Sequence, residues 1–254
     1  MRPSALGLYA SLVYAFLHLP LLVLAVFSFN RSRLTRWEGF SLRWYEGAWS
    51  DRALLAATAN SLTIAAFATV LSTVIGTMAA YGLWKKRSRW LTASLSVSLV
   101  TPEIVTAVSL LALFQMVFRV LHLQLGMHTV VLAHVSFCLV YVVMVVLARL
   151  RTMDASFEEA AQDLGATPWQ AFRDVTLPML KPGILAAALL AFTTSLDDYV
   201  ITSLVAGVDS ETLPMIIYGM ARRGVNPAVN AISTVIVFGL GILIVVSQRL
   251  EQQR

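Results

Sequence analysis

The sequence predicts an all-α membrane protein with six transmembrane helices, on the grounds of its composition and its hydrophobic pattern. Of the 254 residues, 58% are hydrophobic and 13% are charged, against roughly 25% charged residues in typical soluble domains. Such a chain has too little polar material to cover a surface that faces water. The hydrophobic residues also gather in six stretches of about 20 residues or more, the length that crosses a bilayer as a helix.

The six stretches are each bounded by charged residues, glycine or proline. We expect spans at residues 8–29, 57–83, 92–118, 128–148, 183–206 and 229–247. The chain has no repeat and no low-complexity linker, so we expect one domain over residues 1–254. The first stretch lacks a small-x-small cleavage site and is interpreted as a retained helix. Lysine and arginine are in excess on the side that holds both termini, which places both termini in the cytoplasm by the positive-inside rule.

Charge and rare side chains exclude several classes of function. The formal charge is +5, and the basic residues form short clusters between apolar stretches, such as residues 85–87. Such clusters anchor loops near anionic lipid, so we expect no nucleic-acid partner. The lone Cys138 excludes an internal disulfide, and the four histidines, which lack tight ligand spacing, are expected to be satisfied or interfacial rather than metal ligands. The sequence has neither G-x-S-x-G nor G-x-x-x-x-G-K-[ST], so we expect no catalytic residue and no nucleotide site in this chain.

The loop over residues 151–181 begins with signals for a short helix. Ser156 followed by Glu159 predicts a capping box at its start. Gly165 predicts its end, since glycine readily takes the left-handed conformation that terminates helices.

A second helix is expected directly afterwards. Thr167 and Gln170 repeat the capping pattern, with Pro168 at the first helical position. Pro178 and Pro182 are expected to stop this helix before the fifth span. The loop is therefore interpreted as a rigid helix–turn–helix, which either transmits force to a partner or packs on its own helix bundle.

Three carboxylates lie inside predicted spans: Glu103, Asp197 and Asp198. Each costs about 2.5–3.5 kcal/mol to insert near a helix centre, so such residues face a cavity, pair with a cation or relay protons. Asp197 is expected about 21 Å along the fifth span, and Glu103 near mid-depth of the third. Tyr199 adds an aromatic face that suits an ammonium group. The alternative is that the acids are hydrogen-bonded at helix interfaces or lie at the membrane surface.

The loop carries a resemblance to a known family. Glu159-Ala160-Ala161, three residues, Gly165, nine residues and then Val175-x-Leu177-Pro178 resemble the EAA loop of bacterial ABC importer permeases, with valine where the family usually has isoleucine. The resemblance implies the type I (MetI-like) permease fold and a separate ATPase subunit on which the loop docks. It places Glu159, Ala160, Ala161 and Gly165 on the coupling surface.

Residues 195–202 (SLDDYVIT), residues 101–105 (TPEIV) and Leu213-Pro214-x-x-Ile217-Tyr218 are similar to the polyamine importer permeases of the PotC and PotI type. This likeness runs across nearly the whole chain. It implies uptake of putrescine or spermidine through the inner membrane, with Glu103, Asp197, Asp198 and Tyr199 in the substrate pathway. It also implies a sister permease as heterodimer partner, two ATPase subunits that bind ATP and Mg, and an extracytoplasmic binding protein, with no cofactor in this chain.

Two alternatives remain open from the sequence. The first is an ABC importer permease for a different solute, in which the acids are structural. The second is a channel or proton-coupled carrier that works without an ATPase.

Overall fold

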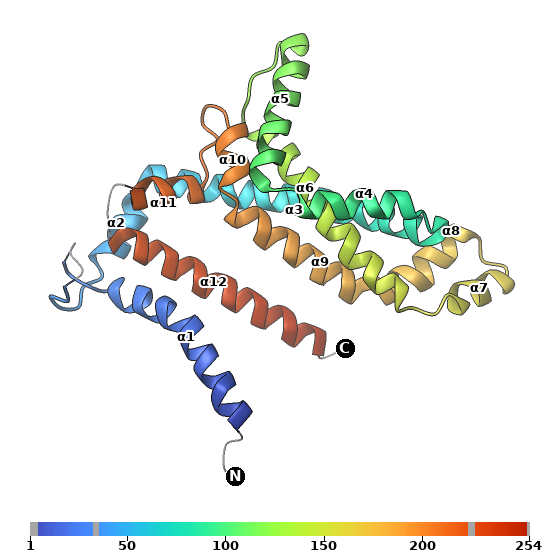
Figure 1. The fold of residues 1–254 in the computed structure, drawn as a ribbon, viewed down its shortest axis with the longest axis horizontal. Helices are drawn as coiled ribbons and strands as arrows, with labels where there is room; N and C mark the ends of the chain where they lie inside the picture. Colours follow the sequence, from blue (N-terminus) through green and yellow to red (C-terminus); the bar gives the residue numbers. More distant parts are fainter. Residues whose placement is uncertain (1–4, 33–35, 223–226, 253–254) are drawn as a thin grey trace. The chain divides into compact units, whose positions relative to one another are not determined.

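The computed structural model describes residues 5–32, 36–222 and 227–252, and within these ranges the protein is helical with no β-strand (Figure 1). The expected all-α class is confirmed. The chain divides into two compact units, Met1–Ala56 with Ile216–Arg254 and Ala57–Met215, called the terminal unit and the central unit below. The single domain over residues 1–254 stays a prediction.

The terminal unit is built on α1 (Ala5–Phe27), α2 (Arg43–Ser50) and α12 (Pro227–Gln252), and α12 packs against both of the others. The segment between α1 and α2 is organised around the buried Asn30. Its side-chain amide donates to the Arg36 carbonyl at 2.8 Å and its side-chain oxygen accepts from the Glu38 N–H at 3.0 Å. The Asn30 carbonyl accepts from the Trp44 indole at 2.7 Å, which fixes α2 to the end of α1.

The central unit is organised around α6 (Met127–Arg151). This helix packs along α9 (Leu177–Asp197) and also against α4 (Arg89–Val100), α5 (Glu103–Leu121) and α10 (Val200–Val205). One buried apolar cluster joins α6 and α9 to α3 (Arg52–Lys86), and a second joins α5, α6 and α10 to α3. The remaining elements are α7 (Ser156–Asp163), α8 (Pro168–Ala171), the π-helix η1 (Phe172–Thr176) and α11 (Leu213–Arg222), which the division between the units cuts.

Five of the described helices are long and apolar enough to cross a membrane: Leu6–Phe27, Arg52–Lys86, Glu103–Leu121, Met127–Arg151 and Pro168–Asp197. In α12 the described apolar stretch, Pro227–Gly239, is shorter. Many large apolar side chains on these helices are exposed, as a lipid-facing surface requires. The number of six spans stays a prediction.

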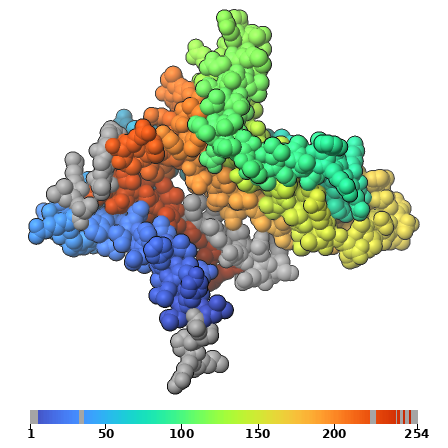
Figure 2. All heavy atoms as spheres, in the orientation of Figure 1, coloured from blue at the N-terminus to red at the C-terminus, as the bar shows by residue number. Residues whose placement is uncertain are grey.

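The third expected span, 92–118, is wrong as one continuous helix. Thr101 and Pro102 are extended (ψ 127° and 136°) and separate α4 from α5, because a residue before proline is driven out of the helical region. Figures 1 and 2 show α5 turning sharply away from α4. Glu103 therefore occupies the first turn of α5, and not the middle of a span.

The fifth expected span, 183–206, is also interrupted. Helix α9 ends at Asp197, Asp198 is extended (ψ 127°), and the chain restarts as the short α10. Asp197 and Asp198 therefore do not follow each other on one helix surface, contrary to the sequence-based expectation.

Candidate functional site

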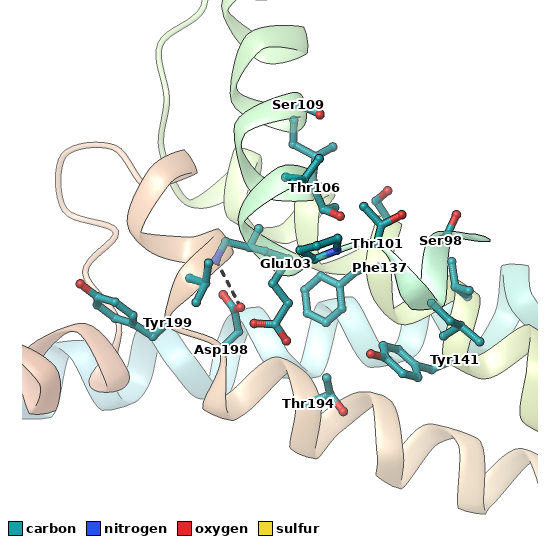
Figure 3. Close-up of a pocket in the computed structure, with 18 of the residues that line it drawn as sticks. Ser98, Thr101, Glu103, Thr106, Ser109, Phe137, Tyr141, Thr194, Asp198 and Tyr199 are labelled. Carbon is teal, nitrogen blue, oxygen red and sulfur yellow. Dashed lines mark hydrogen bonds between the residues drawn. The ribbon is translucent and has the colours of Figure 1, made fainter. Parts of the chain in front are cut away.

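The four residues expected in a substrate pathway line one cavity. Glu103, Asp197, Asp198 and Tyr199 all border a space of about 830 Å³ within the central unit. Figure 3 shows Glu103, Asp198 and Tyr199 at this cavity. The cavity lies where the α4–α5 break and the α9–α10 break come together. These two helix breaks, which the sequence analysis did not predict, therefore position the four side chains at the cavity.

The cavity wall is rich in hydroxyl groups, contributed by Ser98, Thr101, Thr106, Ser109, Ser136, Tyr141 and Thr194. Two of the carboxylates, Glu103 and Asp197, are exposed, and neither forms an ion pair with any described residue. In Figure 3 the Glu103 side chain extends from the start of α5 toward α9. Hydroxyls and unpaired carboxylates together suit a cationic group that also donates hydrogen bonds.

Asp198 has a different environment, because its side chain is only 6% exposed. Its carboxylate accepts from the Thr202 N–H at 2.8 Å, from the Thr202 hydroxyl at 2.7 Å and from the Ile201 N–H at 3.3 Å. These bonds satisfy backbone donors at the start of α10, the role that an N-terminal capping aspartate plays. Asp198 thus fixes the α9–α10 break and leaves Asp197 as the aspartate exposed to the cavity.

His134 is the residue behind this arrangement that sequence reasoning missed. It is fully buried on α6, and its ring nitrogens lie 2.7 Å from the Ser195 hydroxyl and 2.9 Å from the Thr202 hydroxyl. Its Nε2 also lies 3.4 Å from the Asp198 carboxylate. His134 therefore joins α6, α9 and α10 behind the cavity. The sequence carried one signal for this role, because His134 lies within an apolar stretch. A polar side chain buried in such a helix needs hydrogen-bond partners.

Tyr199 lines the cavity at its edge. In Figure 3 its ring points away from the Glu103 and Asp198 carboxylates. The structure therefore brings Tyr199 to the same cavity as the acids without stacking its ring on either of these carboxylates.

The loop after α6 folds as a helix–turn–helix whose second half follows the expected signals. Gly165 has φ +94°, the left-handed conformation that glycine adopts without strain. Thr167 and Gln170 form the predicted capping box, with Pro168 as the first residue of α8. These features are confirmed.

Two details of the loop were predicted wrongly. The N-cap of α7 is Ala155, and Asp154 accepts the Ser156 N–H at 3.0 Å, so Ser156 and Glu159 form no capping box. Pro178 and Pro182 do not stop the second helix, which runs through η1 into α9. In η1 the Leu177 N–H donates to the Phe172 carbonyl five residues back, a π-helical widening that accommodates the following proline.

The residues expected to couple with a partner lie on an open surface of the loop. Glu159, Ala160 and Gly165 are exposed, and Ala161 is half-buried. Beside them Leu164 is 91% exposed, and Phe157 and Trp169 are more than half exposed. Phe157 and Leu164 lie outside the candidate spans, where exposed apolar side chains are typical of a protein–protein contact.

Glu158, next to Glu159, points inward and is only 3% exposed. Its carboxylate accepts from the Tyr81 hydroxyl and the Thr176 hydroxyl, each at 2.8 Å, and pairs with Lys85 at 2.6 Å. Burial raises the pKa of Glu158, but the hydrogen bonds and the Lys85 charge outweigh burial and hold that pKa below the ordinary glutamate value. The loop is therefore anchored to the end of α3.

A set of apolar, membrane-length helices that borders a polar cavity and carries an external helical loop is the architecture of a multi-pass membrane protein. The chain belongs to the family described as the binding-protein-dependent transport system inner membrane component, which matches residues 72–254. It is thus an inner-membrane permease subunit, and its sequence contains no ATPase motif of its own.

Curated relatives match along most of the chain. The putrescine transport system permease protein PotI of Escherichia coli (strain K12) is 44% identical over 237 residues, which cover 91% of this chain and 84% of that protein. The spermidine/putrescine transport system permease protein PotC of Haemophilus influenzae is 40% identical over 245 residues, with 95% and 94% covered.

Solved structures share the fold. A bacterial ABC transporter involved in the import of the acidic polysaccharide alginate superposes with a TM-score of 0.70 at 16% identity, covering 97% of this chain and 94% of that chain. The MetNI methionine ABC transporter gives a TM-score of 0.64 at 20% identity, covering 79% and 93%. The expected MetI-like permease fold is confirmed.

Proposed function

We propose that this subunit forms half of the translocation pathway of an ATP-driven importer of putrescine, spermidine or a related polyamine. The observation that carries the proposal is the pair of exposed carboxylates, Glu103 and Asp197, in one hydroxyl-lined cavity without an ion pair among the described residues. Polyamines present ammonium groups separated by short alkyl stretches, so several weak anionic positions along a path suit their passage. The names of the curated relatives support the same cargo.

The four cavity residues take different roles in this proposal. Glu103 and Asp197 supply the countercharge for an ammonium group, and Tyr199 offers an aromatic face at the cavity edge. Asp198 holds the α9–α10 break in place through Thr202 and so positions Asp197.

The loop over residues 151–181 serves as the coupling element. Glu159, Ala160, Ala161 and Gly165, with the exposed Leu164, dock on a partner ATPase. Two such subunits bind ATP with Mg, a sister permease completes a heterodimer, and an extracytoplasmic binding protein delivers the cargo. Residues 1–254 then form one domain of six spans in the inner membrane, in contact with lipid and with both termini in the cytoplasm.

Reconstitution tests this function. The assembled complex in proteoliposomes, with its binding protein, is expected to accumulate labelled putrescine or spermidine only when ATP and the ATPase subunits are present. Uptake without the ATPase subunits would show a stand-alone channel or carrier. A complex that hydrolyses ATP and accumulates an uncharged solute while ignoring both polyamines would show a permease for another solute. Either result would overturn the proposal.

A further inference from the structure

A second cavity, of about 750 Å³, lies between the end of α3, the start of α4 and the end of α6. Three arginines line it: Arg87, Arg89 and Arg151. None of the three forms an ion pair with a described residue. The one acidic side chain on the wall is Asp154, so the cavity carries an excess of two positive charges.

The Asp154 carboxylate forms no ion pair with these arginines. It accepts the Ser156 N–H at 3.0 Å, and this backbone hydrogen bond lowers the pKa of Asp154 below the ordinary aspartate value. The carboxylate therefore stays ionised while it is directed to the start of α7. The guanidinium groups remain available to a ligand that brings its own negative charge, and arginine binds phosphate with particular geometric fit.

The other side of the cavity is apolar. Leu83 and Trp84 at the end of α3 and Leu147 near the end of α6 contribute this wall, and both helices are candidate membrane spans. Trp90, on the first turn of α4 directly after Arg89, is 87% exposed, as is typical of tryptophans at the membrane–water interface. The cavity thus combines a cationic end and a hydrophobic wall at the ends of two candidate spans.

We propose that this cavity, defined by Arg87, Arg89 and Arg151, binds the phosphate headgroup of an anionic phospholipid, with an acyl chain along the Leu83–Leu147 wall. Basic pockets between the ends of transmembrane helices bind such headgroups. A free phosphate shares the headgroup chemistry but makes no use of the apolar wall. The lipid site is separate from the carboxylate cavity. Only its assignment to the cytoplasmic leaflet rests on the proposed function.

Lipid retention by the purified complex tests the site. The complex in detergent is titrated with phosphatidylglycerol or phosphatidylcholine, and bound lipid is counted by native mass spectrometry. Wild-type protein is expected to retain phosphatidylglycerol in preference to phosphatidylcholine. Arg89→Gln/Arg151→Gln is expected to weaken retention about 30-fold, the effect of two basic residues near a membrane surface. Arg52→Gln/Arg119→Gln removes two exposed arginines that do not line this cavity and is expected to behave as wild type.

Three results would overturn the proposal. The first is equal retention of phosphatidylglycerol by the wild type and by the Arg89/Arg151 variant. The second is displacement of the lipid by millimolar inorganic phosphate, which would show a free-anion site. The third is a map of the complex in which an acidic segment of a partner subunit fills the cavity. Because retention is measured without transport, a failure of polyamine uptake would leave this result untouched.

Discussion

The Lys85 ammonium lies 2.6 Å from the Glu158 carboxylate, and this ion pair joins the end of α3 to the first turn of α7. The same carboxylate holds Tyr81 of α3 and Thr176 of η1 by hydrogen bonds. In the proposed function, a force applied to α7 by the partner ATPase is transmitted through this contact to α3, a candidate membrane span.

Removing the Glu158 carboxylate should destabilise the protein. Glu158→Ala takes the acceptor from the half-buried Tyr81 hydroxyl and from the buried Thr176 hydroxyl, and a buried polar group left unpaired costs about 1–3 kcal/mol. The melting temperature of the purified protein, followed by intrinsic fluorescence, is expected to fall by several degrees. Glu159→Ala is the matched control, because its side chain is exposed one residue further along. Equal melting temperatures for the two variants would contradict the anchor.

The anchor should also depend on pH. Because the pKa of Glu158 is lowered in the folded protein, its contribution to stability is complete above the unfolded value of about 4.3. That contribution disappears as the pH falls through the lower, folded value. The difference in melting temperature between wild type and Glu158→Gln is expected to be constant near neutral pH and to shrink below about pH 4.3. A difference that grows on acidification would show the opposite sign and refute the assignment.

The two adjacent aspartates should respond differently to truncation. Asp198→Ala leaves the Thr202 N–H and the start of α10 without their acceptor, a loss of about 0.5–2 kcal/mol for a capping residue. Asp197→Ala removes an exposed carboxylate and should leave the melting temperature unchanged. Thermal unfolding of both variants in the same detergent checks this. A lower melting temperature for Asp197→Ala than for Asp198→Ala would reverse the roles of the two aspartates.

A charge on the exposed face of the loop should prevent docking of the ATPase. Leu164 is 91% exposed, so Leu164→Asp should not disturb folding, yet it would bury an unpaired carboxylate in any interface formed there. The amount of ATPase that copurifies with the tagged permease is expected to drop sharply. Val208→Asp, at a residue 84% exposed in the α10–α11 loop, is the control and should copurify normally. Undiminished copurification with Leu164→Asp would place the docking surface elsewhere.

Features encoded by neighbouring residues could be predicted from the sequence. The capping box of Thr167 and Gln170 and the left-handed Gly165 depend on spacings of a few residues, so they are visible without a structure. The break at Pro102 was signalled by the proline itself, but the strong hydrophobicity on either side suggested one continuous span.

Features that depend on distant contacts could not be predicted. Which of two adjacent glutamates turns inward is decided by Tyr81, 77 residues before Glu158 in the chain. The partners of His134 lie 61 and 68 residues away, so its spacing to the other histidines carried no information about them. The cavity forms where the α4–α5 break and the α9–α10 break lie close together, and no local sequence pattern predicts that these two breaks come together.

The most direct test of the cation pathway is the amount of putrescine moved per ATP hydrolysed by the reconstituted complex, with loaded binding protein in excess. For Glu103→Gln/Asp197→Asn we predict a ratio about tenfold or more below wild type at an unchanged melting temperature, since a hydrogen bond to a charged group contributes about 1.5–3 kcal/mol. Asp209→Asn/Glu211→Gln neutralises two exposed acids outside the cavity and should keep the wild-type ratio. A wild-type ratio in the Glu103/Asp197 variant would contradict the account.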